Sequence, residues 1–492
     1  MLTVGLALAV LGTIGILLRL VRRIRPAAVP RWRILIVQAA VVALWILGGN
    51  GLASLRERRA EAAWTAVDAK AAARATAASA ASNPAALELL KRAASLGLPV
   101  GKPGSADAGA KDPADEAALA RLGPYLDRVL QQADDRLEAA PTELRAWLVV
   151  EDANARAVER QLLEGGAIDW GPPLAGDSLP YSPLELLKLD AVLTAGALDR
   201  MKAGDAAGAS SALEAASALA ASLRDRPETT SRLLAVALDR RLLGALRLAE
   251  PVAPGWERRL DEIEDHARPT GARPGESLEL LAQVRKPYTT LRGLILETDV
   301  APLVRESRQP ASRQLFLALS GGAVPVEGLA DAVAAERRRT ETPFYVYAQG
   351  PLELPYMRLV AADSASVEAQ TAAQVAAGDS CGPRPIAPQA HLASWSPLEQ
   401  ADEPLLPRLA RTAAMLRAEL ELTRLVVRAR TLRAQSPQRE WPSELPGSDA
   451  SRACPGRRFV SKLLAGRAEI RLEPVPFGEK DAVTSFRMGD GR

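Results

Sequence analysis

Two long uncharged runs open the chain, and a short basic segment separates them. Residues 2–18 (LTVGLALAVLGTIGILL) and residues 34–55 (ILIVQAAVVALWILGGNGLASL) contain no Asp, Glu, Lys or Arg. As helices, these runs are roughly 26 Å and 33 Å long, against a hydrocarbon core of about 30 Å. The pattern therefore predicts a transmembrane helical hairpin over residues 1–55, in contact with the lipid bilayer.

The segment between the two runs determines the predicted orientation. It carries no acidic residue and six arginines, which are Arg19, Arg22, Arg23, Arg25, Arg31 and Arg33. A short loop rich in arginine stays in the cytoplasm, so the N-terminus and all residues after 55 are expected in the periplasm. Arg56, Arg58 and Arg59 follow the second run and oppose this bias, but three arginines do not outweigh six.

Two other interpretations of these runs are open. A cleaved signal peptide has a basic region before its apolar run, and residues 1–5 (MLTVG) have no basic side chain. A buried hairpin of a soluble protein is the second alternative, although such helices rarely run this long without a charge. The pattern favours the membrane hairpin.

The residues after 55 have the spacing of helices. Residues 56–165 form an Ala-rich helical region, with helices expected over residues 117–138 and 142–163. A flexible linker rich in Gly, Pro, Ala and Asp is expected over residues 97–116. Aromatic residues make up 4% of the chain, so Leu, Ala and Val must build the core. Because Ala and Leu are also strong helix formers, the fold class is mostly α.

A central α-helical domain is predicted over residues 182–378. Ser182-Pro183 is a helix start with a cap and a proline in the first turn, and Gly204-Asp205 form a turn. Ala209, Leu213 and Ala216 then follow at the spacing of the second half of a tetratricopeptide repeat. One such unit is found and a solenoid needs about three, so an ordinary Ala-rich helical hairpin is an equal alternative.

The last part, residues 379–492, combines a Pro-rich segment, a long helix and a β-hairpin cap. The preceding domain is expected to end with a helix over residues 357–377. The long helix is expected over residues 407–434, with one apolar seam from Leu409 to Val427. Alternation with a period of two then predicts strands over residues 459–463 and 468–472, with a third strand over 483–488. Within the aromatic segment 342–356, Phe344 and Val346 alternate with Tyr345 and Tyr347, which favours a short strand; the segment lines a groove or is packed into a corner.

Part of the chain resembles uncharacterised bacterial membrane-anchored proteins that are mostly α-helical. The resemblance rests on GDAAGASSALEAASALAASLRDRPETTSRLLAVALDRRLLGALR, followed by LELTRLVVRAR, a Trp-Pro at 441–442 and a Cys-Pro-Gly at 454–456. It covers residues 182–471 with gaps and implies the architecture only, because no activity is assigned to such proteins. The 62 basic residues are mostly arginine, a bias typical of a GC-rich bacterial genome.

The chain has two cysteines, Cys381 and Cys454, which flank the predicted long helix. An even count in an oxidising compartment favours a disulfide, and the flanking segments are long enough to fold back along the helix. Two independent buried thiols are the alternative.

Candidate chemistry is sparse. The histidines are His266 and His391, neither with a second ligand at metal spacing, so no metal and no cofactor are expected. The acidic segment 261–265 (DEIED) is expected to be a solvated helix face, and no nucleophile, P-loop or dinucleotide motif occurs. The net charge of +3 is too small to argue for nucleic acid. These observations favour a scaffold that holds protein partners at the envelope over the alternative, a hydrolytic enzyme with dispersed residues.

Overall fold

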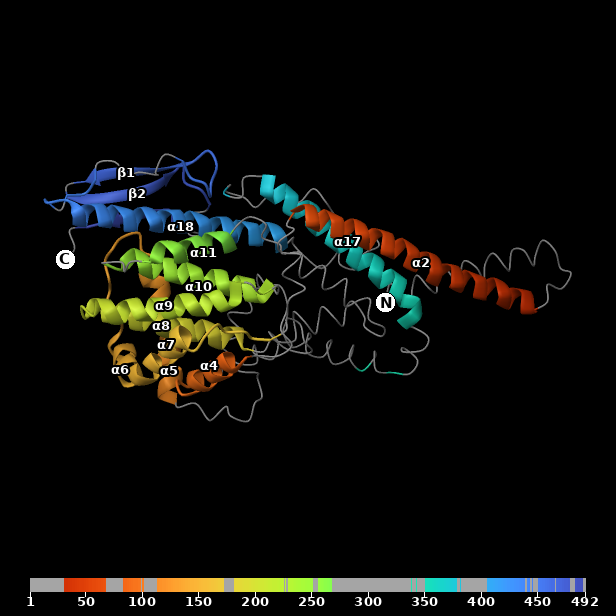
Figure 1. Ribbon diagram of the computed structural model, residues 1–492, viewed down its shortest axis with the longest axis horizontal. Coiled ribbons are helices and arrows are strands. Elements are labelled where there is room, and N and C mark those ends of the chain that lie inside the picture. The colour runs from red at the N-terminus through yellow and green to blue at the C-terminus, as the bar shows by residue number, and fades with distance from the viewer. Residues whose placement is uncertain are drawn as a thin grey trace.

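The fold is mostly α-helical, with a small sheet at the C-terminal end (Figure 1). The computed structural model describes residues 31–67, 83–98, 100, 113–171, 181–224, 226, 229–250, 255–267, 338, 342, 350–377, 381, 405–438, 440–442, 445, 450–464, 466–477 and 483–489. Within these residues the chain forms eleven helices and one three-stranded antiparallel sheet. The predicted fold class, mostly α with a C-terminal β-hairpin, is confirmed at this level.

Helix α2 (Arg31–Val67) contains the second uncharged run and continues without a break into the charged residues after Leu55. Its segment Gln38–Ala63 is long and apolar enough to cross a membrane, and little of it is buried in the protein. Among the described residues it is the one candidate span, where the sequence predicts two. The other predicted span, residues 2–18, lies outside the described residues, so a two-pass arrangement is not shown.

Helix α17 (Gly350–Ala377) lies beside α2, and the two extend together from the rest of the molecule (Figure 1). It begins seven residues before the predicted start at 357 and includes Pro355. Pro355 is the sixth residue of α17, where a proline removes one intrahelical hydrogen bond, and the contact of the helix with α2 outweighs this local cost. The second half of the aromatic segment is therefore helical, and the four residues predicted to form a short strand, 344–347, are not among those that the structure describes. Its first half, residues 343–349, lies outside the described residues.

The remaining helices form a stack (Figure 1), and the contacts between them divide most of the helices into two rows. In one row α5 contacts α8, α8 contacts α10, and α10 contacts α18; in the other α4 contacts α7 and α7 contacts α9. The helices are α4 (Pro84–Ala94), α5 (Pro113–Leu130), α6 (Thr142–Val150), α7 (Asp152–Glu164), α8 (Pro183–Lys202), α9 (Ala206–Arg224), α10 (Thr229–Leu248), α11 (Trp256–His266) and α18 (Leu405–Gln435).

Local signals determine the central helices. The Oγ of Ser182 accepts a hydrogen bond of 3.2 Å from the backbone N–H of Glu185, and Pro183 opens α8. Gly204 has a φ of +79°, which glycine adopts without strain, and it turns the chain between α8 and α9. Leu213 and Ala216 of α9 are buried, as expected of a packed helical hairpin.

Three boundaries in the first helical region differ from prediction. The helix expected to reach 138 ends at Leu130, because residues 133–135 bond instead to Arg487 of the C-terminal strand. The helix expected over 142–163 is interrupted at Glu151, so α6 and α7 are separate. The predicted linker is also narrower, since Leu98 and Val100 are buried and α5 begins at Pro113; residues 101–112 lie outside the described residues.

The sheet has the order β1-β2-β3, with strands β1 (Arg458–Leu464), β2 (Arg467–Glu473) and β3 (Ser485–Met488). Leu464 pairs with Arg467, so β1 and β2 form the predicted hairpin. Along β2, Ala468, Ile470 and Leu472 are buried at alternate positions. That face packs on α18, and the alternate burial confirms the predicted period of two. Strand β3 pairs with β2, which confirms the predicted third strand.

Candidate functional site

Arg358 of α17 binds three side chains of α2. Its Nε donates a hydrogen bond to Oε1 of Glu57 and its Nη2 donates one to Oε2, both 2.8 Å long. Its Nη1 donates one of 2.7 Å to the Oδ1 of Asn50. Nη2 also donates one of 2.8 Å to the Oγ of Ser54. Steps of four and three residues place Asn50, Ser54 and Glu57 on one face of α2. We call these four residues the Arg358 cluster.

Small side chains bring the two helices close together around this cluster. A Cβ added at Gly49 would lie 2.8 Å from the Cβ of Pro355, so a larger residue at 49 would force the helices apart. Ala53 is fully buried in the same contact. The Nε1 of Trp45 donates a hydrogen bond of 2.9 Å to the carbonyl oxygen of Leu352. Because residue numbers rise together along both helices, α2 and α17 run parallel.

The chemistry of the Arg358 cluster is positional. A bidentate guanidinium–carboxylate pair fixes both distance and rotation, and it is stronger than a neutral hydrogen bond. The Glu57 side chain is 2% exposed, and the pair with Arg358 offsets part of the cost of burying its charge. The cluster therefore holds α17 at one register on the candidate membrane helix. The polar stripe on α2 is visible in the sequence, but its partner lies about 300 residues away.

Helix α10 carries three consecutive charged residues that reach three different helices. Asp239 accepts hydrogen bonds of 3.1 Å and 2.6 Å from Arg224 of α9, whereas Arg240 donates one of 2.8 Å to Glu419 of α18. Consecutive helix positions point about 100° apart, so one short segment can connect several neighbours. These pairs place α10 at the centre of the stack.

The third residue of this segment, Arg241, faces Asp190 of α8. Its Nη1 donates a hydrogen bond of 3.3 Å to Oδ2 of Asp190. The other oxygen, Oδ1, has no hydrogen-bond partner among the described residues. Burial raises the pKa of Asp190 to about 7, and the nearby charge of Asp239 adds to this, while Arg241 opposes it. Asp190 is 1% exposed, so it has no access to a substrate in this state.

A pocket of about 210 Å³ opens where α8, α9, α10 and α11 come together. Small residues at the α8–α9 turn leave this space, and a tryptophan forms part of its wall. Its lining residues are Met201, Gly204, Ala206, Ala209, Ser210, Leu213, Leu246, Ala249, Glu250 and Trp256. The guanidinium of Arg259 stacks 5.4 Å from the centre of the Trp256 ring. The lining is mixed, because the apolar side chains of Leu213 and Leu246 share it with the polar side chains of Ser210 and Glu250.

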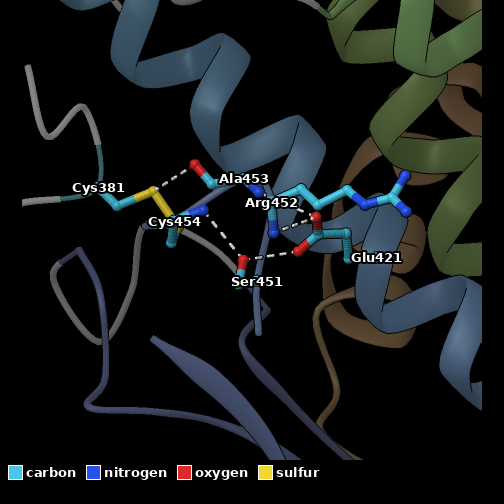
Figure 2. Close-up of a disulfide and its surroundings, with 6 residues drawn as sticks. All are labelled: Cys381, Glu421, Ser451, Arg452, Ala453 and Cys454. Carbon is cyan, nitrogen blue, oxygen red and sulfur yellow. Dashed lines mark hydrogen bonds between the residues drawn. A yellow bond between two sulfur atoms is a disulfide. The ribbon is translucent and has the colours of Figure 1, made fainter. Parts of the chain in front are cut away.

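The predicted disulfide between Cys381 and Cys454 is present (Figure 2). Their Cα atoms are 5.5 Å apart, and both side chains are buried. Glu421 of α18 supports the loop before Cys454, accepting hydrogen bonds of 2.6 Å from Ser451 Oγ and 2.8 Å from the backbone N–H of Arg452. The bond therefore fastens residue 381 to a loop that α18 already holds.

The other residues singled out in the sequence are not brought together. Arg19, Arg22, Arg23 and Arg25 lie outside the described residues, whereas Arg31 and Arg33 fall in the first turn of α2. His391 also lies outside them, and His266 ends α11.

The acidic segment of α11 is largely solvated, as predicted, since Asp261, Glu262 and Asp265 are exposed. Asp261 and Glu264 also pair with Arg424 of α18. Within the described part of the chain, no group of His, Cys, Asp or Glu is arranged to hold a metal ion.

Comparison of the chain with models of protein families, with curated proteins and with solved structures finds no match.

Proposed function

We propose that this protein is a two-pass protein of a bacterial inner membrane, with both ends in the periplasm, and that its helical stack holds protein partners at the cell envelope. The observation that carries the proposal is the join between the apolar helix α2 and the rest of the protein through the Arg358 cluster. A helix that served only as an anchor needs no such polar contact. The six arginines before α2 and the disulfide favour the periplasmic side.

The arrangement of the helices supports an interaction role. The helices lie in two rows, and within each row every helix contacts the next one. Tetratricopeptide-type repeats use this arrangement to build an extended binding surface. Ala209, Leu213 and Ala216 occupy the close contacts of the α8–α9 hairpin, where the repeat pattern requires small and apolar residues. The pocket at the end of this hairpin is the position at which a partner's apolar side chain would bind.

A photo-crosslinking experiment on the full-length protein in its own membrane tests this role. A photoreactive amino acid at Ala206, an exposed residue that lines the pocket, is expected to give one discrete protein adduct. The same group at Glu164, an exposed residue of α7, is the matched control and is expected to give none. Equal or absent adducts at both positions, with hydrolytic activity of the purified full-length protein, would favour the enzyme alternative instead.

The orientation is tested separately. A reporter that is active only in the periplasm, fused after Arg492, is expected to be active. Activity from a cytoplasm-only reporter at the same position would contradict the periplasmic assignment and leave the partner-binding role to be judged from the crosslinks.

A further inference from the structure

We infer that the first turns of α17, from Gly350 to Arg358, enter the outer leaflet of the membrane beside α2. This inference rests on the proposed function, because it requires α2 to cross the bilayer. In addition to α2, helix α17 from the distant C-terminal part of the chain then penetrates the lipid. The extracytoplasmic domain is then seated on the membrane at a fixed orientation.

The register of the two helices carries the inference. Leu352 of α17 is bonded at the level of Trp45, and Pro355 contacts Gly49. Trp45 lies ten residues before Leu55, the last residue of the uncharged run. Ten residues of helix cover about 15 Å, which is half of a hydrocarbon core of about 30 Å. The start of α17 therefore lies beside the outer half of the apolar run, and not beyond its end.

Moving α2 relative to the membrane does not remove this overlap. If α2 left the hydrocarbon at Trp45, residues 34–44 alone would have to cross it, and eleven residues cover only about 16 Å. The run cannot be extended backwards, because Arg31 and Arg33 precede it. A span of sufficient length must therefore include the turns of α2 that α17 contacts.

The exposed side chains have the chemistry of a lipid-facing surface. Leu44 and Leu47 of α2 are 73% and 74% exposed, and Leu352 of α17 is 37% exposed. Exposed leucine side chains of this kind are more favourable in hydrocarbon than in water. Residues 350–357 (GPLELPYM) contain one charged residue, Glu353, which is half-buried.

The charged contacts between α2 and α17 lie where the uncharged run of α2 ends and its charged residues begin. Arg358 pairs with Glu57, and Arg56 lies 3.5 Å from Asp363, both just past the end of the uncharged run. Charged groups near a membrane are stable when they are paired and close to the headgroups. The Arg358 cluster thus marks the outer boundary of the apolar layer on both helices.

Spin labels on introduced cysteines test the depth of α17, since Cys381 and Cys454 are already bonded to each other. The full-length protein in phospholipid vesicles carries one label at a time, as Leu352→Cys, Leu44→Cys or Ala373→Cys. Oxygen concentrates in hydrocarbon and a nickel chelate stays in water, so the ratio of their effects on the label reports depth. Ala373 is exposed near the other end of α17 and is the matched control.

The ratio of oxygen to nickel accessibility at Leu352 and Leu44 is expected to be several-fold higher than at Ala373. If Leu352 resembles Ala373 while Leu44 remains oxygen-accessible, α17 does not enter the leaflet, and the membrane anchor stands. If Leu44 also resembles Ala373, α2 is not in the membrane, and the anchoring part of the proposed function is wrong.

Discussion

Arg358 and Glu57 lie 301 residues apart in the chain and form a bidentate pair, with both hydrogen bonds 2.8 Å long. The pair fixes α17 to the apolar helix α2 and buries the Glu57 carboxylate. Both helices run in the same direction, so the pair sets one register for the whole contact. Removing Arg358 takes its bidentate pair away from a carboxylate that stays buried, which makes this contact a sensitive test of the structure.

Arg358→Ala is expected to release α17 from α2. The lost pair leaves the Glu57 charge buried, a change that typically costs about 3 to 5 kcal/mol. Amide hydrogen exchange of α17 in the purified full-length protein is expected to become much faster. Arg59→Ala removes an exposed arginine from the same region of α2 and is expected to leave this exchange unchanged. Equal exchange in both variants would show that the pair does not hold the helices.

Ala216→Arg is expected to destabilise the helical stack. Ala216 is 1% exposed in α9, so an arginine there places a charge in a close helix contact and costs about 3 kcal/mol or more. The melting temperature measured by circular dichroism is expected to fall by several degrees. Ala221→Arg makes the same change at an exposed position of the same helix. An unchanged melting temperature for Ala216→Arg would contradict the packed hairpin.

Loss of the disulfide is expected to destabilise the C-terminal part. The bond closes a loop with a sequence separation of 73 residues. In the chain-entropy model, such a loop contributes about 4 kcal/mol, which Cys454→Ser removes. Thiol labelling of the unfolded, unreduced wild-type protein is expected to find no free thiol, and two free thiols per chain would rule the bond out.

Asp190 is expected to make stability fall as the pH rises. Its pKa is about 7 in the folded protein, against about 3.9 for an Asp in an unfolded chain. Between these values the folded state binds a proton that the unfolded state lacks, so the free energy of unfolding decreases with rising pH. From pH 5 to pH 8 the contribution of Asp190 to this decrease is roughly 2 to 3 kcal/mol, and Asp190→Asn is expected to remove that contribution. Burial also raises the pKa values of Asp239 and Glu421, and their contributions remain in the variant.

Urea unfolding followed by tryptophan fluorescence measures this difference at the two pH values. Asp127→Asn, at an exposed position of α5, is the control and is expected to retain the full decrease. If Asp190→Asn retains it as well, the buried carboxyl group does not titrate in this window.

The sequence by itself determined the elements whose signals are local. Ser182-Pro183 and Gly204 begin and end α8, since a cap, a proline and a left-handed glycine act within one turn. The hairpin of β1 and β2 follows from alternation with a period of two around a short turn. These features do not depend on a distant partner. The disulfide does, but its partners are known from the sequence, because two cysteines allow one intrachain pairing.

Only the tertiary structure decided the features that depend on distant contacts. The helix expected to reach 138 ends at Leu130 because residues near 134 bond to Arg487. Helix α17 begins at Gly350 and lies along α2, although Pro355 disfavours a helix locally. The partners of Asp239, Arg240 and Arg241 lie on three different helices. Hydrogen bonds and charge pairs act over a few ångströms in space, and sequence periodicity does not show which distant residues the fold brings that close.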